Sequence, residues 1–404
     1  MNEESGLKNK NVWWLSATSF FTDISSEMIF PILPIFLKSV LGAPIWIIGV
    51  IEGVAQGVAA FLQYFAGFLA DKINNRKKLV LWGYGISFLA KGVFALANSA
   101  WMVSIFRISD RVGKGIRTAP RDALIANSVD ASVRGRYFGL HRSLDTAGAI
   151  LGTVIALFFL NFYDEGIATV LRAVLYWSLV PALIGWVLLL KVREVGDVES
   201  SRPVKLLAWG NLDKRFRDFL VLAFLFGLAN YSYAFYILRA SELGVAVFAV
   251  PLVYLVYNIF YGFSSYPAGI MSDKLGRRNI LILALVFLAA VNFGFVYVAN
   301  LSLVWVLFAL YGLVIGMTDG VMKAFVSDLV IENRALSFGW FNIILGVATI
   351  FGNVIGGVLW QRHGAFYAFG LSGFLSLIAV VYLFYKNSLA LKGGDGKIKF
   401  QAYR

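Results

Sequence analysis

Two carboxylates interrupt the first apolar segment of the chain, which covers residues 13–38. Asp23 and Glu27 are four residues apart, so they share one face if the segment is a helix. A charge at the centre of a lipid bilayer costs roughly 2.5–3.5 kcal/mol, and such a residue therefore faces a partner or water. At 1.5 Å per residue, Asp23 lies about 15 Å from the start of the segment. We expect these acids to exchange protons; the alternative is that they only neutralise a neighbouring helix.

A stripe of basic residues runs along the fourth apolar segment, residues 101–124. Its members recur every three or four positions and are Arg107, Arg111, Lys114, Arg117 and Arg121. On a helix they occupy one face about 120° wide. Such a stripe cannot face lipid, so it lines a polar cavity or meets acids. The estimated depths predict an Asp23–Arg111 or a Glu27–Arg107 contact.

Two hypotheses explain this stripe. In the first, the arginines keep the carboxylates ionised until a proton or a substrate displaces the pair, which couples proton and substrate movement. In the second, the stripe binds an anionic substrate through guanidinium contacts. For Arg117 and Arg121, a simpler alternative is pairing with Asp122 or with lipid phosphate.

Other segments also carry polar residues. Glu52 lies among glycines spaced four residues apart, which predicts close helix packing beside a second proton site. Asp319 and Lys323 are four residues apart, and Arg142 and Asp145 are three apart. Each pair predicts an ion pair within one helix or half of a gate between two parts of the protein.

Tyrosine and asparagine are frequent between residues 230 and 261. Their rings and amides predict a pocket for an organic substrate. The alternative is a belt at the membrane surface with hydrogen bonds between helices.

Composition identifies the elements that position these residues. The chain has 404 residues, of which 59% are hydrophobic and 15% charged, and its mean hydropathy is +0.75. Apolar runs of about 18 residues or more match a bilayer core. Cysteine is absent and only two histidines occur, so we expect neither a metal nor a cofactor. The net charge of +13 lies largely in connecting segments, where it orients helices, and does not predict nucleic-acid binding.

The hydropathy pattern predicts twelve membrane-spanning helices. The expected spans are residues 13–38, 45–70, 79–98, 101–124, 138–161, 169–190, 218–240, 246–268, 279–299, 302–328, 338–360 and 365–386. Basic linkers alternate with short, nearly uncharged ones, which places the basic linkers and both termini in the cytoplasm.

The chain also divides into two similar halves. We expect an N-terminal six-helix bundle at 1–190, a cytoplasmic linker at 191–217, a C-terminal six-helix bundle at 218–390 and a tail at 391–404. The sequence GFLADK at 67–72 returns as GIMSDK 202 positions later, and RGRYFG at 134–139 returns as RALSFG 200 positions later. Internal repeats of this kind are typical of transporters with a substrate site between the halves.

The segments GFLADKINNRKK (67–78) and GIMSDKLGRR (269–278) resemble the cytoplasmic loop signature of the major facilitator superfamily. This resemblance implies an all-α membrane fold with two pseudo-symmetric six-helix bundles. It also implies a conformational latch in which charges pair across helix ends; the alternative is that they only anchor the topology. The latch residues are Gly67, Asp71, Arg76, Lys77, Gly269, Asp273, Arg277 and Arg278.

The fourth segment, RVGKGIRTA (111–119), resembles the pattern of drug/proton antiporters of this superfamily through Arg111 and Gly115. Lys114 stands where those proteins usually have glutamine, and the fifth segment lacks their proline. The sequences FFTDISSEMIFPILP (20–34) and DRVGKGIRTAPRDALI (110–125) are similar to those of an uncharacterised prokaryotic group of facilitators.

The sequence therefore predicts a monomeric secondary transporter of the inner membrane, which exports a small organic solute by proton-coupled alternating access. Uptake or exchange of an organic anion is the alternative, and a non-transporting receptor or scaffold is an alternative of another class. No phosphate-binding loop or catalytic constellation indicates an enzyme. Proton coupling is assigned to Asp23, Glu27, Glu52 and Arg111. Substrate binding is assigned to Arg107, Lys114, Tyr231, Tyr257, Asn258 and Asp319.

Overall fold

The computed structural model describes residues 3–72, 75–129, 134–162, 165–195, 212–298, 300–329 and 334–386. For residues 3–9, 63–72, 95, 134–135 and 334–336 it describes the backbone alone. The expected tail at 391–404 and most of the expected linker at 191–217 lie outside the described residues.

The first half of the chain forms six crossing segments from ten elements. These are α1 (Glu3–Ile29), α2 (Leu33–Ile35), the π-helix η1 (Phe36–Val40), α3 (Ile45–Lys72), α4 (Arg76–Ala95), α5 (Ala100–Asn127), α6 (Arg134–Phe162), α7 (Ile167–Trp177), α8 (Leu179–Leu188) and the 3-10 turn η3 (Leu189–Lys191). α1, α2 and η1 together form one crossing, and so do α7, α8 and η3.

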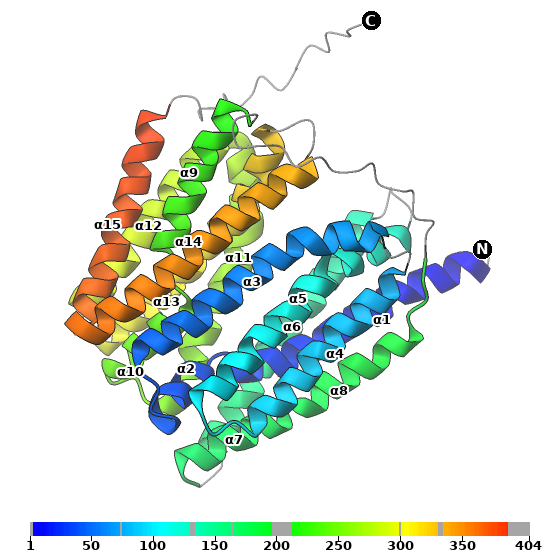
Figure 1. The fold of residues 1–404 in the computed structure, drawn as a ribbon, viewed down its shortest axis with the longest axis horizontal. Coiled ribbons are helices and arrows are strands. Elements are labelled where there is room, and N and C mark those ends of the chain that lie inside the picture. The colour runs from blue at the N-terminus through cyan, green and yellow to red at the C-terminus, as the bar shows by residue number, and fades with distance from the viewer. Residues whose placement is uncertain are drawn as a thin grey trace, which may run out of the picture.

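The second half repeats this order. Its elements are α9 (Lys214–Ala229), α10 (Tyr233–Glu242), the 3-10 turn η5 (Val247–Ala249), α11 (Val250–Leu275), α12 (Arg277–Tyr297), α13 (Leu301–Leu329), α14 (Arg334–His363) and α15 (Ala365–Tyr385). α9 and α10 form one crossing, and η5 leads directly into α11. The described residues thus contain the twelve crossings that hydropathy predicted, arranged as two groups of helices (Figure 1).

Ten of these twelve crossings are apolar and long enough to span a bilayer on composition alone. The other two, α4 and α5, run alongside them through the first half. α5 carries the basic stripe, and α4 carries Lys91 in its interior. α3 and α4 pack against α5, and Arg107, Asp110 and Arg117 of α5 and Lys91 of α4 are buried.

Three crossings that the sequence predicted as continuous helices are broken. One break separates α7 from α8 at Ser178, and the other two occupy equivalent places in the two halves. α1 ends at Ile29 and α9 ends at Ala229, 200 residues later. Pro31 and Pro34 lack the N–H groups that would continue the first helix. In the break after α9, Ser232 caps α10, since its hydroxyl accepts from the amide of Ala234. The duplicated halves therefore bend at equivalent places.

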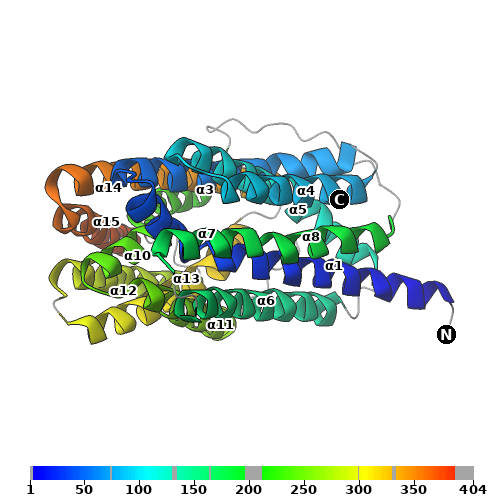
Figure 2. The same ribbon diagram turned by 90° about the horizontal axis from the view of Figure 1, so that it is seen from below.

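The two halves meet along two helix pairs, α3 with α14 and α6 with α11 (Figure 2). Close approach in the first pair depends on the glycines of α3, because a Cβ at Gly53 would lie 3.1 Å from the carbonyl oxygen of Ile350. The expected packing role of these glycines agrees with this contact. The halves also touch where α2 meets α10. We call this the α10 end, and the opposite end, where α1 begins, the N-terminal end (Figure 1).

Candidate transport site

A buried ion pair lies between the halves near the α10 end. Arg107 of α5 donates from Nε to Glu52 Oε1 of α3 over 2.9 Å and from Nη2 to Oε2 over 3.0 Å. The two side chains are 0% and 1% exposed. Charges removed from water in this way need a partner and further hydrogen bonds. The two hydrogen bonds between Arg107 and Glu52 make each the charged partner of the other.

The second half supplies the additional hydrogen bonds. Arg107 Nη2 also donates to the hydroxyl of Tyr233 over 2.8 Å, and the Ser232 hydroxyl donates to Glu52 Oε2 over 3.0 Å. Ser232 is held in turn by Asn353 of α14, whose Oδ1 accepts from the Ser232 amide over 2.9 Å. The break between α9 and α10 therefore presents its polar groups to the ion pair of the first half.

Other side chains satisfy two further backbone carbonyls of this break. The Tyr311 hydroxyl donates to the carbonyl oxygen of Tyr231 over 3.0 Å, and the Ser372 hydroxyl donates to that of Ala229. Unwound backbone is stable at membrane depth only when its polar groups are paired inside the protein. The hydrogen bonds of these side chains therefore stabilise the break within the fold.

Phe30 occupies the equivalent break of the first half. The guanidinium carbons of Arg107 and Arg111 lie 4.5 and 4.9 Å from the centre of its ring. Cations over an aromatic face are stabilised, and more strongly so away from water. Arg107 consequently contacts both breaks, Phe30 directly in the first and Tyr233 in the second.

The acids of α1 face the basic stripe without an ion pair. The cations that act on Glu27 are Lys114 and Arg111, and those that act on Asp23 are Lys114, Arg117 and Arg121. Among the described residues, neither acid has a cation within 4 Å. The expected Asp23–Arg111 and Glu27–Arg107 contacts are therefore not formed, because Glu52 takes Arg107.

The members of the stripe nearest the N-terminal end, Arg117 and Arg121, behave differently from one another. Arg121 pairs with Asp122 at 2.9 Å, as its simpler interpretation predicted. Arg117 turns toward α4, where its Nη1 donates to the Ser87 hydroxyl over 2.6 Å and its guanidinium carbon lies 4.1 Å from the centre of the Tyr84 ring. Arg111 and Lys114, in the middle of the stripe, are the cations that act on Glu27.

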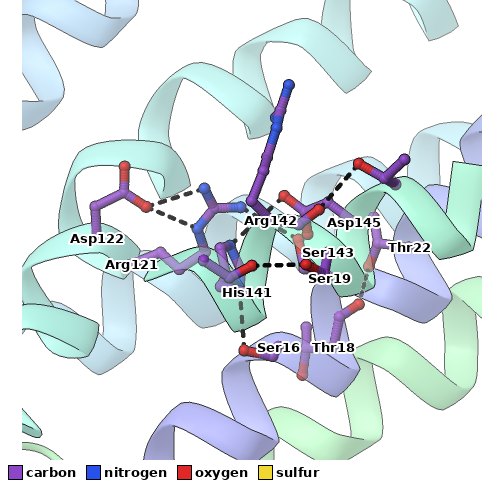
Figure 3. Close-up of polar contacts among 12 residues, drawn as sticks. Ser16, Thr18, Ser19, Thr22, Arg121, Asp122, His141, Arg142, Ser143 and Asp145 are labelled. Atoms are coloured by element: carbon purple, nitrogen blue, oxygen red, sulfur yellow. Dashed lines mark hydrogen bonds and ion pairs between the residues drawn. The ribbon is translucent and has the colours of Figure 1, made fainter. Parts of the chain in front are cut away.

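A polar cluster joins α1, α5 and α6 beside this site (Figure 3). His141 of α6 lies 3.2 Å from the hydroxyl of Ser16 through Nδ1 and 3.7 Å from Asp145 Oδ2 through Nε2. Arg121 donates to the Ser19 hydroxyl over 3.3 Å. Asp145 therefore has His141 as its neighbour, and the expected Arg142–Asp145 ion pair is wrong.

Arg142 instead crosses to the second half. It donates to the hydroxyl of Tyr261 on α11 over 3.0 Å, and that hydroxyl donates to Asp319 Oδ2 of α13 over 3.4 Å. Asp319 pairs with Lys323 at 2.6 Å, as the spacing predicted. Their side chains are 46% and 55% exposed, in contrast to the fully buried Arg107. The accessible surface therefore includes the polar residues of α13 but not the ion pair near the α10 end.

The tyrosines of the second half form a continuous row. Ring centres are 5.3 Å apart for Tyr233 and Tyr254, 5.5 Å for Tyr254 and Tyr257, and 6.2 Å for Tyr257 and Tyr261. Tyr254 lies beside Glu27. Tyr257 belongs to this row and is half-buried, as is the next residue, Asn258. Nδ2 of Asn258 has no partner among the described residues.

Tyr231 lies apart from this row of tyrosines. Its hydroxyl donates to the carbonyl oxygen of Ala368 over 3.0 Å, and its ring packs near Phe235 and Phe369. It is 1% exposed. Tyrosine-rich composition could not distinguish this packing residue from its neighbours, and we remove Tyr231 from the candidate substrate residues.

Two buried charges escaped the sequence prediction. Lys91 of α4 donates to the hydroxyls of Ser25 and Ser26 on α1 over 2.8 and 2.9 Å. Asp110 of α5 is also buried and acts on Lys91. A lone lysine inside an otherwise apolar span was the available signal. These residues fix α1 against α4 and α5, behind the face that carries Asp23 and Glu27.

The expected latch residues lie at the N-terminal end. Arg277 pairs with Asp273 at 2.5 Å and with Asp328 of α13 at 3.0 Å, and Arg278 donates to the carbonyl oxygen of Leu383. In the first half, the Lys77 amide donates to Glu194 over 2.7 Å. Gly269 is a helical residue of α11 with open space around it.

Of the remaining latch residues, the structure describes only the side chain of Arg76. Nε and Nη1 of Arg76 have no hydrogen-bond partner among the described residues. The side chain of Asp71 and the surroundings of Gly67 lie outside the described parts of the structure. The charges of the second half therefore link neighbouring helix ends within that half.

Two bent, duplicated halves that share a polar interface form the architecture of a secondary transporter. A sequence profile of the Major Facilitator Superfamily matches residues 15–239 and 219–400. The chain belongs to this superfamily.

Similar proteins support this assignment. The chain is 37% identical over 370 residues to the uncharacterised MFS-type transporter MJ1317 of Methanocaldococcus jannaschii, covering 89% of this chain and 91% of that protein. It is 24% identical over 289 residues to the multidrug resistance protein MdtH of Escherichia coli O1:K1, covering 70% and 69%. The crystal structure of nucleoside transporter NupG superposes with a TM-score of 0.75 at 15% identity, covering 97% of this chain and all of that one (100%).

Proposed function

We propose that this secondary transporter exports a small organic solute in exchange for protons. The observation that carries the proposal is the arrangement of Asp23 and Glu27, which lie near Lys114 and Arg111 but form no ion pair within 4 Å in the part of the chain that the structure describes. Either acid can gain or lose a proton without breaking a salt bridge. A charge change at this position alters the field between the halves, where a substrate would bind.

The buried Arg107–Glu52 pair supports alternating access. With Ser232 and Tyr233 it joins the halves near the α10 end, while Asp319 and Lys323 are about half exposed. We propose that this pair holds the α10 end closed and separates when the opposite state forms. Arg107 and Glu52 then serve closure, and the middle of the stripe serves binding.

The expected orientation places the N-terminal end in the cytoplasm. Basic residues of two short connections lie there, among them Lys77 and Arg277. Positive residues concentrate on the cytoplasmic side of membrane proteins. In an inner membrane, the site would then load from the cytoplasm. The name of the relative MdtH, a multidrug resistance protein, agrees with export.

Proton flux in liposomes tests the proposal. Purified protein is reconstituted with a trapped pH-sensitive dye, a pH gradient is imposed, and panels of cationic, neutral, zwitterionic and anionic compounds are added. We expect a compound to dissipate the gradient with wild type and with Glu165→Gln, an exposed carboxylate outside the site. The response should be lost with Asp23→Asn or Glu27→Gln. Undiminished proton flux in both variants would contradict coupling through these acids, and absence of any flux would favour a receptor or scaffold.

Uptake or exchange of an organic anion is a second candidate. It is favoured by Lys114, which is exposed although it lies mid-helix, and by Arg111, whose Nε has no partner among the described residues. In this case anion exchange would proceed without a pH gradient. It would be lost in Arg111→Gln or Lys114→Gln but retained in Asp23→Asn.

A further inference from the structure

Among the described residues, four charged side chains where α1 faces the middle of α5 have no ion pair, two acidic and two basic. They are Asp23, Glu27, Arg111 and Lys114. Arg117 and Arg142 also have none, but they turn away to Ser87 of α4 and Tyr261 of α11. Charged neighbours of these four are already matched, because Arg107 pairs with Glu52, Arg121 with Asp122, and Lys323 with Asp319. The unpaired set has no net charge when all four are ionised, but it has separate acidic and basic poles.

Buried polar atoms without partners mark both poles. Oε2 of Glu27 and Nε of Arg111 are each shielded from water, and neither has a hydrogen-bond partner among the described residues. Buried groups of this kind are normally satisfied, so an orphaned acceptor and an orphaned donor at one site indicate that another molecule completes them. Each belongs to a charged group, which makes the missing bonds strong ones.

An aromatic surface connects the two poles. Phe30 lies three residues after Glu27 on the chain, and the Arg111 guanidinium carbon lies 4.9 Å from the centre of its ring. Tyr254 of the opposite half lies beside Glu27. One turn further along α11, Asn258 presents an unpaired amide nitrogen. A ligand that spans the poles would contact this aromatic surface with its apolar body.

From this geometry we infer that the transport site takes a zwitterion, with its cationic group on Glu27 and its anionic group on Arg111 and Lys114. The inference rests on the proposed function and names its substrate class. A ligand with one charge would satisfy one pole and leave the other uncompensated, which is costly inside a membrane protein. A zwitterion satisfies both poles and leaves the net charge of the site unchanged.

Matched ligand sets test this inference by binding alone. Each set contains an amino acid, its N-acetyl derivative and its amide, which are respectively zwitterionic, anionic and cationic at about pH 6.5. Phenylalanine, leucine and tryptophan provide three sizes of apolar body. Thermal-shift titrations of purified protein give apparent Kd values. We expect at least one amino acid to bind about tenfold or more tightly than both of its derivatives, the size of one charge-assisted hydrogen bond.

Two substitutions should change this preference in opposite directions. Glu27→Gln removes the carboxylate that would bind the cationic group, so the N-acetyl derivative should gain relative to the amino acid. Arg111→Gln removes a cation, so the amide should gain relative to the amino acid. Asp23→Asn and the exposed Lys114→Gln repeat the two tests if either first variant is not monodisperse. Glu165→Gln should keep the wild-type order.

The inference is overturned if no amino acid exceeds its derivatives with wild-type protein, or if both substitutions weaken all three forms equally. These outcomes are distinguishable from failure of the proposed export. Binding of zwitterions without proton flux would refute proton coupling alone. Proton flux driven only by singly charged compounds would refute the zwitterion site alone.

Discussion

Arg107 and Glu52 form a two-point ion pair in which both side chains are almost fully buried, and each also bonds to the opposite half of the molecule. Buried ion pairs do not by themselves add much net stability, but removing one partner leaves an uncompensated charge. Their position between two helix breaks therefore makes them sensitive reporters of whether the α10 end is closed.

Glu52→Gln should open the α10 end. The change leaves Arg107 buried without a counter-charge, at a cost of about 3–5 kcal/mol that separation of the halves and entry of water would relieve. Because the chain lacks cysteine, Lys38→Cys and Ser241→Cys would be its only thiols, and both positions line a small pocket at this end. Spin-label distances between them should lengthen in Glu52→Gln.

Asp122→Asn is the matched control for this experiment. It also neutralises an acid paired with an arginine, but its side chain is 43% exposed. Exposed pairs contribute about 0–1 kcal/mol, so its distance distribution should equal that of the parent. An unchanged distribution in Glu52→Gln as well would remove the closing role from the buried pair.

Asn353→Ala should destabilise the fold more than Asn161→Ala. Both asparagines donate from Nδ2 to the carbonyl four residues earlier over 2.8 Å, but only Asn353 also accepts the amide of Ser232. Its loss leaves that buried amide unpaired, at a cost of about 1–3 kcal/mol. Thermal denaturation of both variants in the same detergent measures the difference, and equal midpoints would show that the break does not depend on Asn353.

Gly49→Ala should separate α3 from α14. The added Cβ would collide with the carbonyl oxygen of Asn353, and a second neighbour, Phe235 Cζ, would lie 3.2 Å away. Gly262→Ala on α11 meets nothing within 4 Å and should be neutral or stabilising by up to about 1 kcal/mol, because alanine favours helix. Thermal midpoints of the two variants test this contrast; a Gly49→Ala protein as stable as wild type would mean that this helix contact adjusts easily.

Arg277→Gln should slow transport more than it lowers stability. Arg277 is joined to Asp273 and Asp328, whose side chains are 63% and 40% exposed, and such pairs contribute about 0–1 kcal/mol each. A latch between α11, α12 and α13 would nevertheless set the rate of conformational change. We expect a several-fold lower flux with a nearly unchanged thermal midpoint, whereas Arg362→Gln at the opposite end should retain both. A parallel loss of flux and stability would leave Arg277 with a structural role only.

The sequence predicted most of the architecture because hydropathy and the repeat are one-dimensional signals. The twelve crossings and the superfamily follow from run lengths and loop motifs. The bend after Ile29 has a sequence signal in Pro31 and Pro34, whereas the bend after Ala229 lies inside an apolar run that contains no proline. The membrane depth estimated from residue positions placed Arg107 at the level of Glu27. It gave no information on which neighbouring helix would face Arg107. The rotation of each helix about its own axis is determined only when the helices pack. Packing brings Glu52 of α3 to Arg107.

Individual residues in the site show the same limit. The spacing of Asp319 and Lys323 predicted their ion pair because four residues along one helix fix the distance. The distance between Arg142 and Tyr261 depends on two helices from different halves, and no local pattern records it. Lys91 was visible as a lone charge, but its serine partners on α1 were not.

The charge content of α5 affects how the chain enters the membrane. With five basic residues and two acidic ones, this helix gains too little from lipid to partition into it alone. The ribosome delivers the acids of α1 and α3 before α5, because synthesis proceeds from the N-terminus. When Arg107 leaves the translocon, Glu52 is therefore already available as its counter-ion. The order of charges along the chain therefore favours membrane insertion. If α3 and α5 were exchanged in the sequence, Arg107 would reach the lipid before its partner Glu52.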